Sequence, residues 1–93
     1  MKLPRLGLLA TVLVATLVSM ACGLSHSKWA DIHYSNGYGF SKQGLYGQAI
    51  KEYDKAIELN PTLAKAYVNR AAAYLQLGQF QQAIQDSDKA IQL

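Results

Sequence analysis

One stretch of this chain occurs twice, and the repetition constrains the fold more than any other feature. Residues 46–59 read YGQAIKEYDKAIEL, and residues 80–93, thirty-four positions later, read FQQAIQDSDKAIQL. Eight of these positions are identical between the two copies. A fixed period of this size is typical of a solenoid, in which no repeat can bury its own apolar face. The sequence therefore predicts two stacked copies of one supersecondary unit.

Apolar residues recur at helical spacing, and short turn sequences separate the helical stretches. The sequence predicts helices over residues 29–43, 45–59 and 64–77, and a fourth from residue 79 or 80 to 93. Gly44 and Gly78 suit the left-handed conformation that follows a helix end, and Pro61 stops the helix before it. Because short connections make successive helices antiparallel neighbours, we expect an all-α fold of four antiparallel helices.

Small residues recur where paired helices must approach closely, and aromatic residues stand between them. The small residues are Gly37, Ala49, Ala56, Ala71, Ala83 and Ala90, and the aromatic residues are Phe40, Tyr46, Tyr74 and Phe80. Alternating large and small side chains let facing helices interdigitate, so these positions predict the core and need no functional explanation.

With these residues in place, the chain resembles the tetratricopeptide repeat (TPR) family, which has this period. The family's pattern is matched by Gly37, Phe40, Ala49, Tyr53, Ala56 and Pro61, and in the second copy by Ala71, Tyr74, Ala83 and Ala90. Ser87 stands where an aromatic residue is usual, which predicts a thinly packed spot on the last helix. The resemblance covers residues 30–63 as one repeat and residues 64–93 as a second, incomplete repeat without a capping helix. It implies a short right-handed solenoid of two helix-turn-helix units.

The resemblance also implies a concave groove, lined by the first helix of each repeat, that binds a peptide or partner protein. By position, its residues are Tyr34, Ser35, Tyr38, Lys42, Lys65, Asn69, Ala72 and Gln76, extended by Asp31, Ser41, Val68 and Leu75. Tyr34 and Tyr38 are either an exposed aromatic platform or half-buried cover over a small core. Asn69 matches an asparagine of the carboxylate clamp of some members, but these two tyrosines replace the clamp's lysine and asparagine. We therefore expect no working clamp.

No group of residues points to catalysis, a metal or a nucleic acid. His26 and His33 have no carboxylate or thiol at ligand spacing, and two repeats offer no deep pocket. We expect no catalytic residue, no metal and no cofactor. Without Lys2 and Arg5, seven basic residues face six acidic ones, and this near balance gives no electrostatic argument for nucleic acid.

Residues 1–21 differ in composition from the rest and have the layout of a secretory signal peptide. Lys2 and Arg5 precede an apolar run over residues 6–18, and Ser19 and Ala21 provide a small-residue cleavage site. The run is shorter than the roughly 20 residues that a membrane-spanning helix needs. We therefore expect export to the cell envelope, with an uncleaved membrane anchor as the alternative.

Cys22, the only cysteine, directly follows this segment. A lone cysteine in an exported protein requires an explanation, and residues 18–22 (VSMAC) resemble a bacterial lipobox, whose cysteine becomes lipidated. We expect Cys22 to anchor the protein in a membrane, facing the periplasm or cell surface, with residues 22–29 as lipidated cysteine and tether. Ordinary cleavage at the same bond is the alternative and leaves a soluble secreted protein.

Two repeats are fewer than the three or more that solenoids normally need. Ile84 and Ile91 are therefore expected to form an exposed apolar patch on the last helix. The chain is either a fragment of a longer array or completes its stack by self-association or on a partner. We expect a lipid-anchored protein-interaction module. The alternative is a truncated accessory segment, or a self-associating structural part of a larger envelope assembly.

Overall fold

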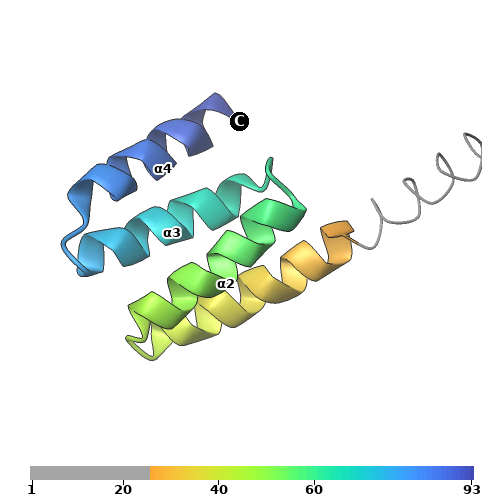
Figure 1. The fold of residues 1–93 in the computed structure, drawn as a ribbon, viewed down its shortest axis with the longest axis horizontal. Coiled ribbons are helices and arrows are strands. Elements are labelled where there is room, and N and C mark those ends of the chain that lie inside the picture. The colour runs from red at the N-terminus through yellow and green to blue at the C-terminus, as the bar shows by residue number, and fades with distance from the viewer. Residues whose placement is uncertain (1–25) are drawn as a thin grey trace, which may run out of the picture.

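The computed structural model describes residues 26–93, which form four helices joined by short turns (Figure 1). The first helix spans residues 26–42 of the described part. It is followed by α2 (Tyr46–Leu59), α3 (Ala64–Gln76) and α4 (Phe80–Gln92). No strand occurs among residues 26–93, so the all-α prediction is confirmed. The predicted signal peptide and Cys22 lie outside the described residues.

The first helix begins three residues before its predicted start at residue 29, since residues 26–28 are helical as well. Ala30 is fully buried, and the rings of Trp29 and His33 have their centroids 6.4 Å apart, one helical turn along the same face. Such contacts at a spacing of four residues favour helix over an extended tether. The helix therefore extends into the segment predicted as a tether, and the predicted start at residue 29 was three residues too late.

The turn after the first helix and the turn after α3 have the same geometry. Gly44 and Gly78 have φ of 77° and 75°, in the left-handed region that residues with a Cβ rarely adopt. The N–H groups of Leu45 and Gln79 each donate to the carbonyl five residues earlier, at 2.9 Å in both cases. These bonds satisfy carbonyls that a helix end leaves unpaired, so both glycines end their helices as predicted.

The helices pack side by side, with α4 on the far side of α3 from α2 (Figure 1), and the first helix contacts both α2 and α3. α3 packs against both α2 and α4. His33 links the first helix to α2, since its Nδ1 lies 2.6 Å from a carboxylate oxygen of Glu52. The arrangement is the short solenoid that the repeat predicts.

The core consists mainly of alanines around two tyrosines. Its fully or nearly fully buried apolar residues are Ala30, Ala49, Tyr53, Ala56, Ala66, Tyr67, Ala71, Ala73 and Ala83. Tyr53, the largest fully buried side chain, lies directly against Gly37, where an added Cβ would come within 2.7 Å of its ring. Gly37 therefore permits a close approach of the first helix to α2, as the alternation of small and large residues predicts.

Arg70 joins three helices. From α3, its Nε and Nη2 donate to the two carboxylate oxygens of Asp86 in α4 at 2.7 and 2.6 Å, and its Nη1 donates to Asp54 in α2 at 2.7 Å. These hydrogen bonds, above all those from Asp86, raise the pKa of Arg70 above its ordinary value, so the guanidinium stays charged. The repeat pattern gives no sign of this cluster, because the first repeat has Asn36 at the position that corresponds to Arg70.

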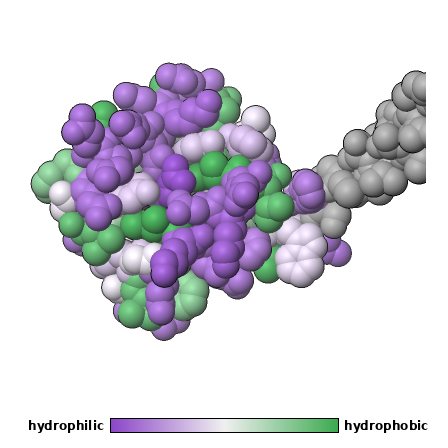
Figure 2. All heavy atoms as spheres, viewed as in Figure 1, coloured by the Kyte–Doolittle hydropathy of each residue, from purple (hydrophilic) through white to green (hydrophobic). Residues whose placement is uncertain are grey.

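The outer face of α4 is exposed, as predicted for Ile84 and Ile91, whereas the prediction of Phe80 as a core residue was wrong because no helix of the described part of the chain packs over it. Phe80, Ile84 and Ile91 are 62%, 61% and 83% exposed. Ser87 is also exposed, and its hydroxyl donates to the carbonyl of Ala83 at 2.9 Å. Figure 2 shows hydrophobic residues that reach the surface at several separate places among hydrophilic ones. Within residues 26–93, no helix combines the length and the hydropathy needed to cross a membrane.

Candidate functional site

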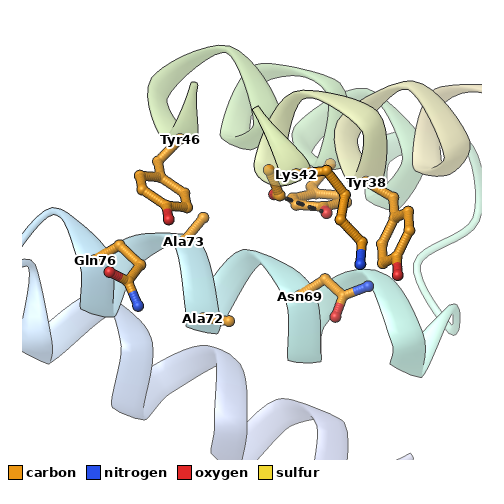
Figure 3. A pocket seen from close by; sticks show the side chains of 9 residues that line it. Tyr38, Lys42, Tyr46, Asn69, Ala72, Ala73 and Gln76 are labelled. Atoms are coloured by element: carbon orange, nitrogen blue, oxygen red, sulfur yellow. Dashed lines mark hydrogen bonds between the residues drawn. The ribbon is translucent and has the colours of Figure 1, made fainter. Parts of the chain in front are cut away.

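A cavity of about 250 Å³ opens where the first helix and the start of α2 face α3 (Figure 3). It is lined by Tyr38, Ser41, Lys42, Tyr46, Tyr53, Asn69, Ala72, Ala73 and Gln76. Five of the eight residues predicted for the core of the groove are among them: Tyr38, Lys42, Asn69, Ala72 and Gln76. The structure therefore brings together residues from both repeats that lie more than thirty positions apart in sequence.

Polar groups stand at both ends of this cavity. Figure 3 shows Tyr46 and Gln76 at one end and Tyr38 and Asn69 at the other, with the ammonium group of Lys42 reaching toward α3. Lys42 Nζ lies 5.2 Å from the centroid of the Tyr38 ring, which is 46% exposed. A cation at this distance from an aromatic face is attracted to it, so the pair presents a positive charge beside an aromatic surface.

Tyr34 and Tyr38 have different roles. The sequence left two alternatives for the pair, cover over the core or an exposed aromatic platform, and Tyr34 fits the first whereas Tyr38 fits the second. Tyr34 is half-buried, and its hydroxyl oxygen accepts a hydrogen bond of 2.7 Å from Asn69 Nδ2. Its ring centroid lies 6.0 Å from that of Tyr53. Tyr34 thus covers the core and holds Asn69 in place, whereas Tyr38 is exposed to solvent.

Lys65 and Ser35 were predicted for the groove but do not line this cavity. Lys65 Nζ lies 4.5 Å from the centroid of the Tyr34 ring and 3.3 Å from Asp31, and Tyr34, also predicted for the groove, does not line the cavity either. Ser35 lines a separate hollow of about 360 Å³ with Asn36, Gly39, Phe40, Gln43 and Glu52.

Sequence reasoning missed Tyr46, Tyr53 and Ala73, which complete the lining. Tyr46 and Tyr53 belong to the second helix of the first repeat, whereas the resemblance assigns the groove to first helices. Tyr53 reaches the cavity from the core, and its hydroxyl lies 3.2 Å from that of Ser41. Burial raises the pKa of Tyr53, so its phenol stays neutral at ordinary pH. The sequence offered one indication that position 46 is structurally important, because both repeats have an aromatic residue there, Tyr46 and Phe80.

No acidic side chain lines the cavity, and Lys42 is its one cationic group. Its chemistry therefore suits a partner segment with an apolar or aromatic side chain, a carboxylate, and backbone groups for the Asn69 and Gln76 amides. Within the part of the chain that the structure describes, no three His, Cys, Asp or Glu residues are grouped to hold a metal ion.

Stacked helix pairs of one repeated pattern, with an open aromatic and polar cavity across both repeats, define a helical-repeat protein of the kind that binds other proteins. The family model described as "TPR repeat" matches residues 37–78, and the one described as "Tetratricopeptide repeat" matches residues 64–93. Through these residues, the chain belongs to the tetratricopeptide-repeat family.

Curated relatives include plant Hsp70-Hsp90 organizing proteins. Hsp70-Hsp90 organizing protein 3 of Arabidopsis thaliana is 41% identical over 64 residues, which are 69% of this chain and 12% of that protein. The Hsp70-Hsp90 organizing protein of Triticum aestivum is 42% identical over 66 residues, 71% of this chain and 11% of that protein. This chain thus spans only about an eighth of the length of these relatives.

Two solved structures share the fold. The Arabidopsis OM64 TPR domain superposes with a TM-score of 0.70 at 38% identity, covering 71% of this chain and 55% of that one. MamA superposes with a TM-score of 0.67 at 30% identity, covering 69% of this chain and 37% of that one.

Proposed function

We propose that this protein is a non-catalytic interaction module, and that its cavity binds a peptide or helix of a partner protein. The observation that carries this proposal is the cavity itself, which combines the exposed ring of Tyr38, the charge of Lys42 and the amides of Asn69 and Gln76. By their names, the plant relatives organise Hsp70 and Hsp90, which supports a protein as the ligand.

Each group in the cavity has a role in this binding. The rings of Tyr38 and Tyr46 offer flat surfaces to an apolar side chain, and tyrosine is enriched in such interfaces. Asn69, held by Tyr34, is oriented before the partner arrives, which lowers the entropy lost on binding. Lys42 attracts a carboxylate of the partner. The preferred ligand is therefore an acidic peptide with at least one aromatic or aliphatic side chain.

An array of synthetic heptapeptides that pair one aromatic residue with Asp or Glu tests the proposal, with affinities measured by fluorescence anisotropy. For the best binder, Tyr38→Ala and Lys42→Ala should each weaken binding about tenfold, the usual effect of removing a central interface side chain. Lys51→Ala removes an equal charge from the exposed face of α2 and should leave the affinity unchanged. Equal affinities for all four proteins would contradict binding in this cavity.

We also propose that the chain is exported and anchored by lipid at Cys22. The support is the order of Lys2, Arg5, the apolar run and Cys22 in the sequence. In bacterial cells given radioactive palmitate, the parent chain should be labelled and should sediment with membranes. The Cys22→Ser variant should take up no label and should not sediment with membranes. Ser27→Ala, a matched change outside the cleavage site, should behave like the parent. An unlabelled parent in the soluble fraction would favour ordinary cleavage.

We propose self-association through α4 as a second interaction. Its support is the exposure of Ile84 and Ile91, because apolar side chains that project together from a small protein favour association. No residue of α4 lines the cavity, so self-association and peptide binding do not compete for the same side chains.

A further inference from the structure

The two repeats are alike in sequence, but corresponding side chains of α2 and α4 differ in how far they are buried. On α2, the stripe of Tyr46, Ile50, Tyr53 and Ile57 is buried or half-buried, and α3 packs against that helix. Thirty-four positions later, the stripe of Phe80, Ile84, Ser87 and Ile91 on α4 is exposed throughout. α4 therefore lacks a neighbour equivalent to the one that α3 provides for α2.

The residues with which α3 meets α2 have counterparts on the first helix. Arg70 binds Asp54 of α2, and Ala73 lines the cavity beside Tyr46 and Tyr53. Their counterparts, thirty-four positions earlier, are Asn36 and Gly39, and both line the hollow of about 360 Å³ described above. The first helix thus carries, on its outer side, the surface that α3 uses to cover α2.

We propose that this hollow on one copy of the chain receives the α4 stripe of a second copy, so that copies stack head to tail as α3 stacks on α2. The proposal rests on the self-association proposed above and names the surface that α4 contacts. The partner is a second copy because the chain carries both faces of the α2–α3 contact, one at each end of its stack (Figure 1).

The shapes and polar groups of the two faces agree. The stripe projects Phe80, Ile84 and Ile91, whereas a Cβ added at Gly39 in the hollow would meet no atom within 4 Å, which leaves space for such a side chain. Asp88 is the counterpart of Asp54, so the amide of Asn36 in the next copy replaces Arg70 as its donor. Glu52 also lines the hollow, but its charge is paired with His33 and Lys55.

Because this contact joins two different faces, it is heterologous and leaves one free face at each end of every assembly. A copy with a blocked hollow retains a working α4, and a copy with a blocked α4 retains a working hollow. Two blocked variants therefore complement each other, which does not occur in a symmetric contact between two α4 helices.

The test measures the mass of the full chain by light scattering over a series of concentrations. Gly39→Gln fills the hollow, and Ile84→Gln removes the central side chain of the stripe. Each variant alone should associate about tenfold more weakly than the parent. An equimolar mixture of the two should form a one-to-one complex at the parent's affinity and grow no further. Leu45→Gln, which introduces the residue that the second repeat has at position 79, is the matched control and should associate like the parent.

Three outcomes would overturn the inference, and they separate it from the broader proposal. A parent that stays monomeric at all concentrations rejects self-association altogether. If Ile84→Gln is monomeric but Gly39→Gln associates like the parent, the contact is symmetric through α4 and only the head-to-tail arrangement fails. If both variants match the parent, association occurs through another part of the chain.

Discussion

At the scale of the residue, two glycines of the first helix show how burial decides the consequence of one methyl group. Gly37 lies against the ring of Tyr53, whereas Gly39, two positions later, has open space where a side chain would begin. Glycine is unfavourable in a helix interior at both positions, so local propensity treats them alike. Only the packing of α2 on the first helix distinguishes them.

We expect Gly37→Ala to lower the free energy of unfolding by about 1–3 kcal/mol, because the new methyl group overlaps a fully buried ring. We expect Gly39→Ala to raise it by about 0.5–1 kcal/mol through helix propensity alone. Urea unfolding followed by circular dichroism, at a concentration where the parent is monomeric, measures both changes. Shifts of the same sign would show that Tyr53 does not pack against Gly37 in solution.

At the scale of the element, Arg70 fixes α4 on α3 and α3 on α2 through one side chain. Asp86 is only 5% exposed, and its two carboxylate oxygens accept from Arg70. Removal of one partner leaves a buried charge without compensation, which is more destabilising than removal of both. Because the buried apolar residues of α3 and α4 are mostly alanines, the Arg70 cluster supplies the long polar side chains that connect these helices.

We expect Arg70→Ala to destabilise the fold by about 3–5 kcal/mol, enough to unfold a small domain in part. The double variant Arg70→Met, Asp86→Leu replaces the buried pair by apolar groups and should recover most of that loss. Lys65→Ala breaks the exposed pair with Asp31 and should change the stability by less than about 1 kcal/mol. Thermal unfolding compares the four proteins. A double variant as unstable as Arg70→Ala would contradict this account.

At the scale of the whole molecule, the stack has two unequal ends. The end at the first helix is hollowed and polar, whereas the end at α4 projects apolar side chains. At the internal contact the corresponding stripe includes Tyr53, a fully buried aromatic residue, whereas α4 has Ser87 at that position. For the proposed head-to-tail contact, the missing ring predicts weaker packing between copies than between repeats within one copy.

We therefore expect the double variant Ala71→Gly, Ser87→Tyr to strengthen self-association about tenfold. The glycine gives the new ring the space that Gly37 gives Tyr53, and the ring adds a large apolar area to the contact. Gln85→Tyr adds the same ring to another exposed face of α4 and should have no such effect. Sedimentation of the full chain over a concentration series measures both. Equal strengthening by the two variants would indicate nonspecific adhesion of tyrosine in place of a defined contact.

The sequence alone determined the features that depend on spacing along one helix. The repeat predicted four helices, the glycines predicted two of their ends, and the apolar positions predicted both the alanine core and the bare isoleucines of α4. These features depend on the helical period of 3.6 residues and on local backbone preferences. Both are set by residues close together in sequence, so no knowledge of the rest of the fold is needed.

The tertiary structure alone decided which side chains meet across helices. It placed Ser35 outside the cavity and Tyr53 inside it, and it gave Tyr34 and Tyr38 different roles. It also joined Arg70 to two carboxylates, each sixteen residues away. The physical reason is that such contacts depend on the crossing and rotation of packed helices. A shift of one residue in rotation turns a side chain by about 100°, and spacing along a single helix carries no information about its neighbour's rotation.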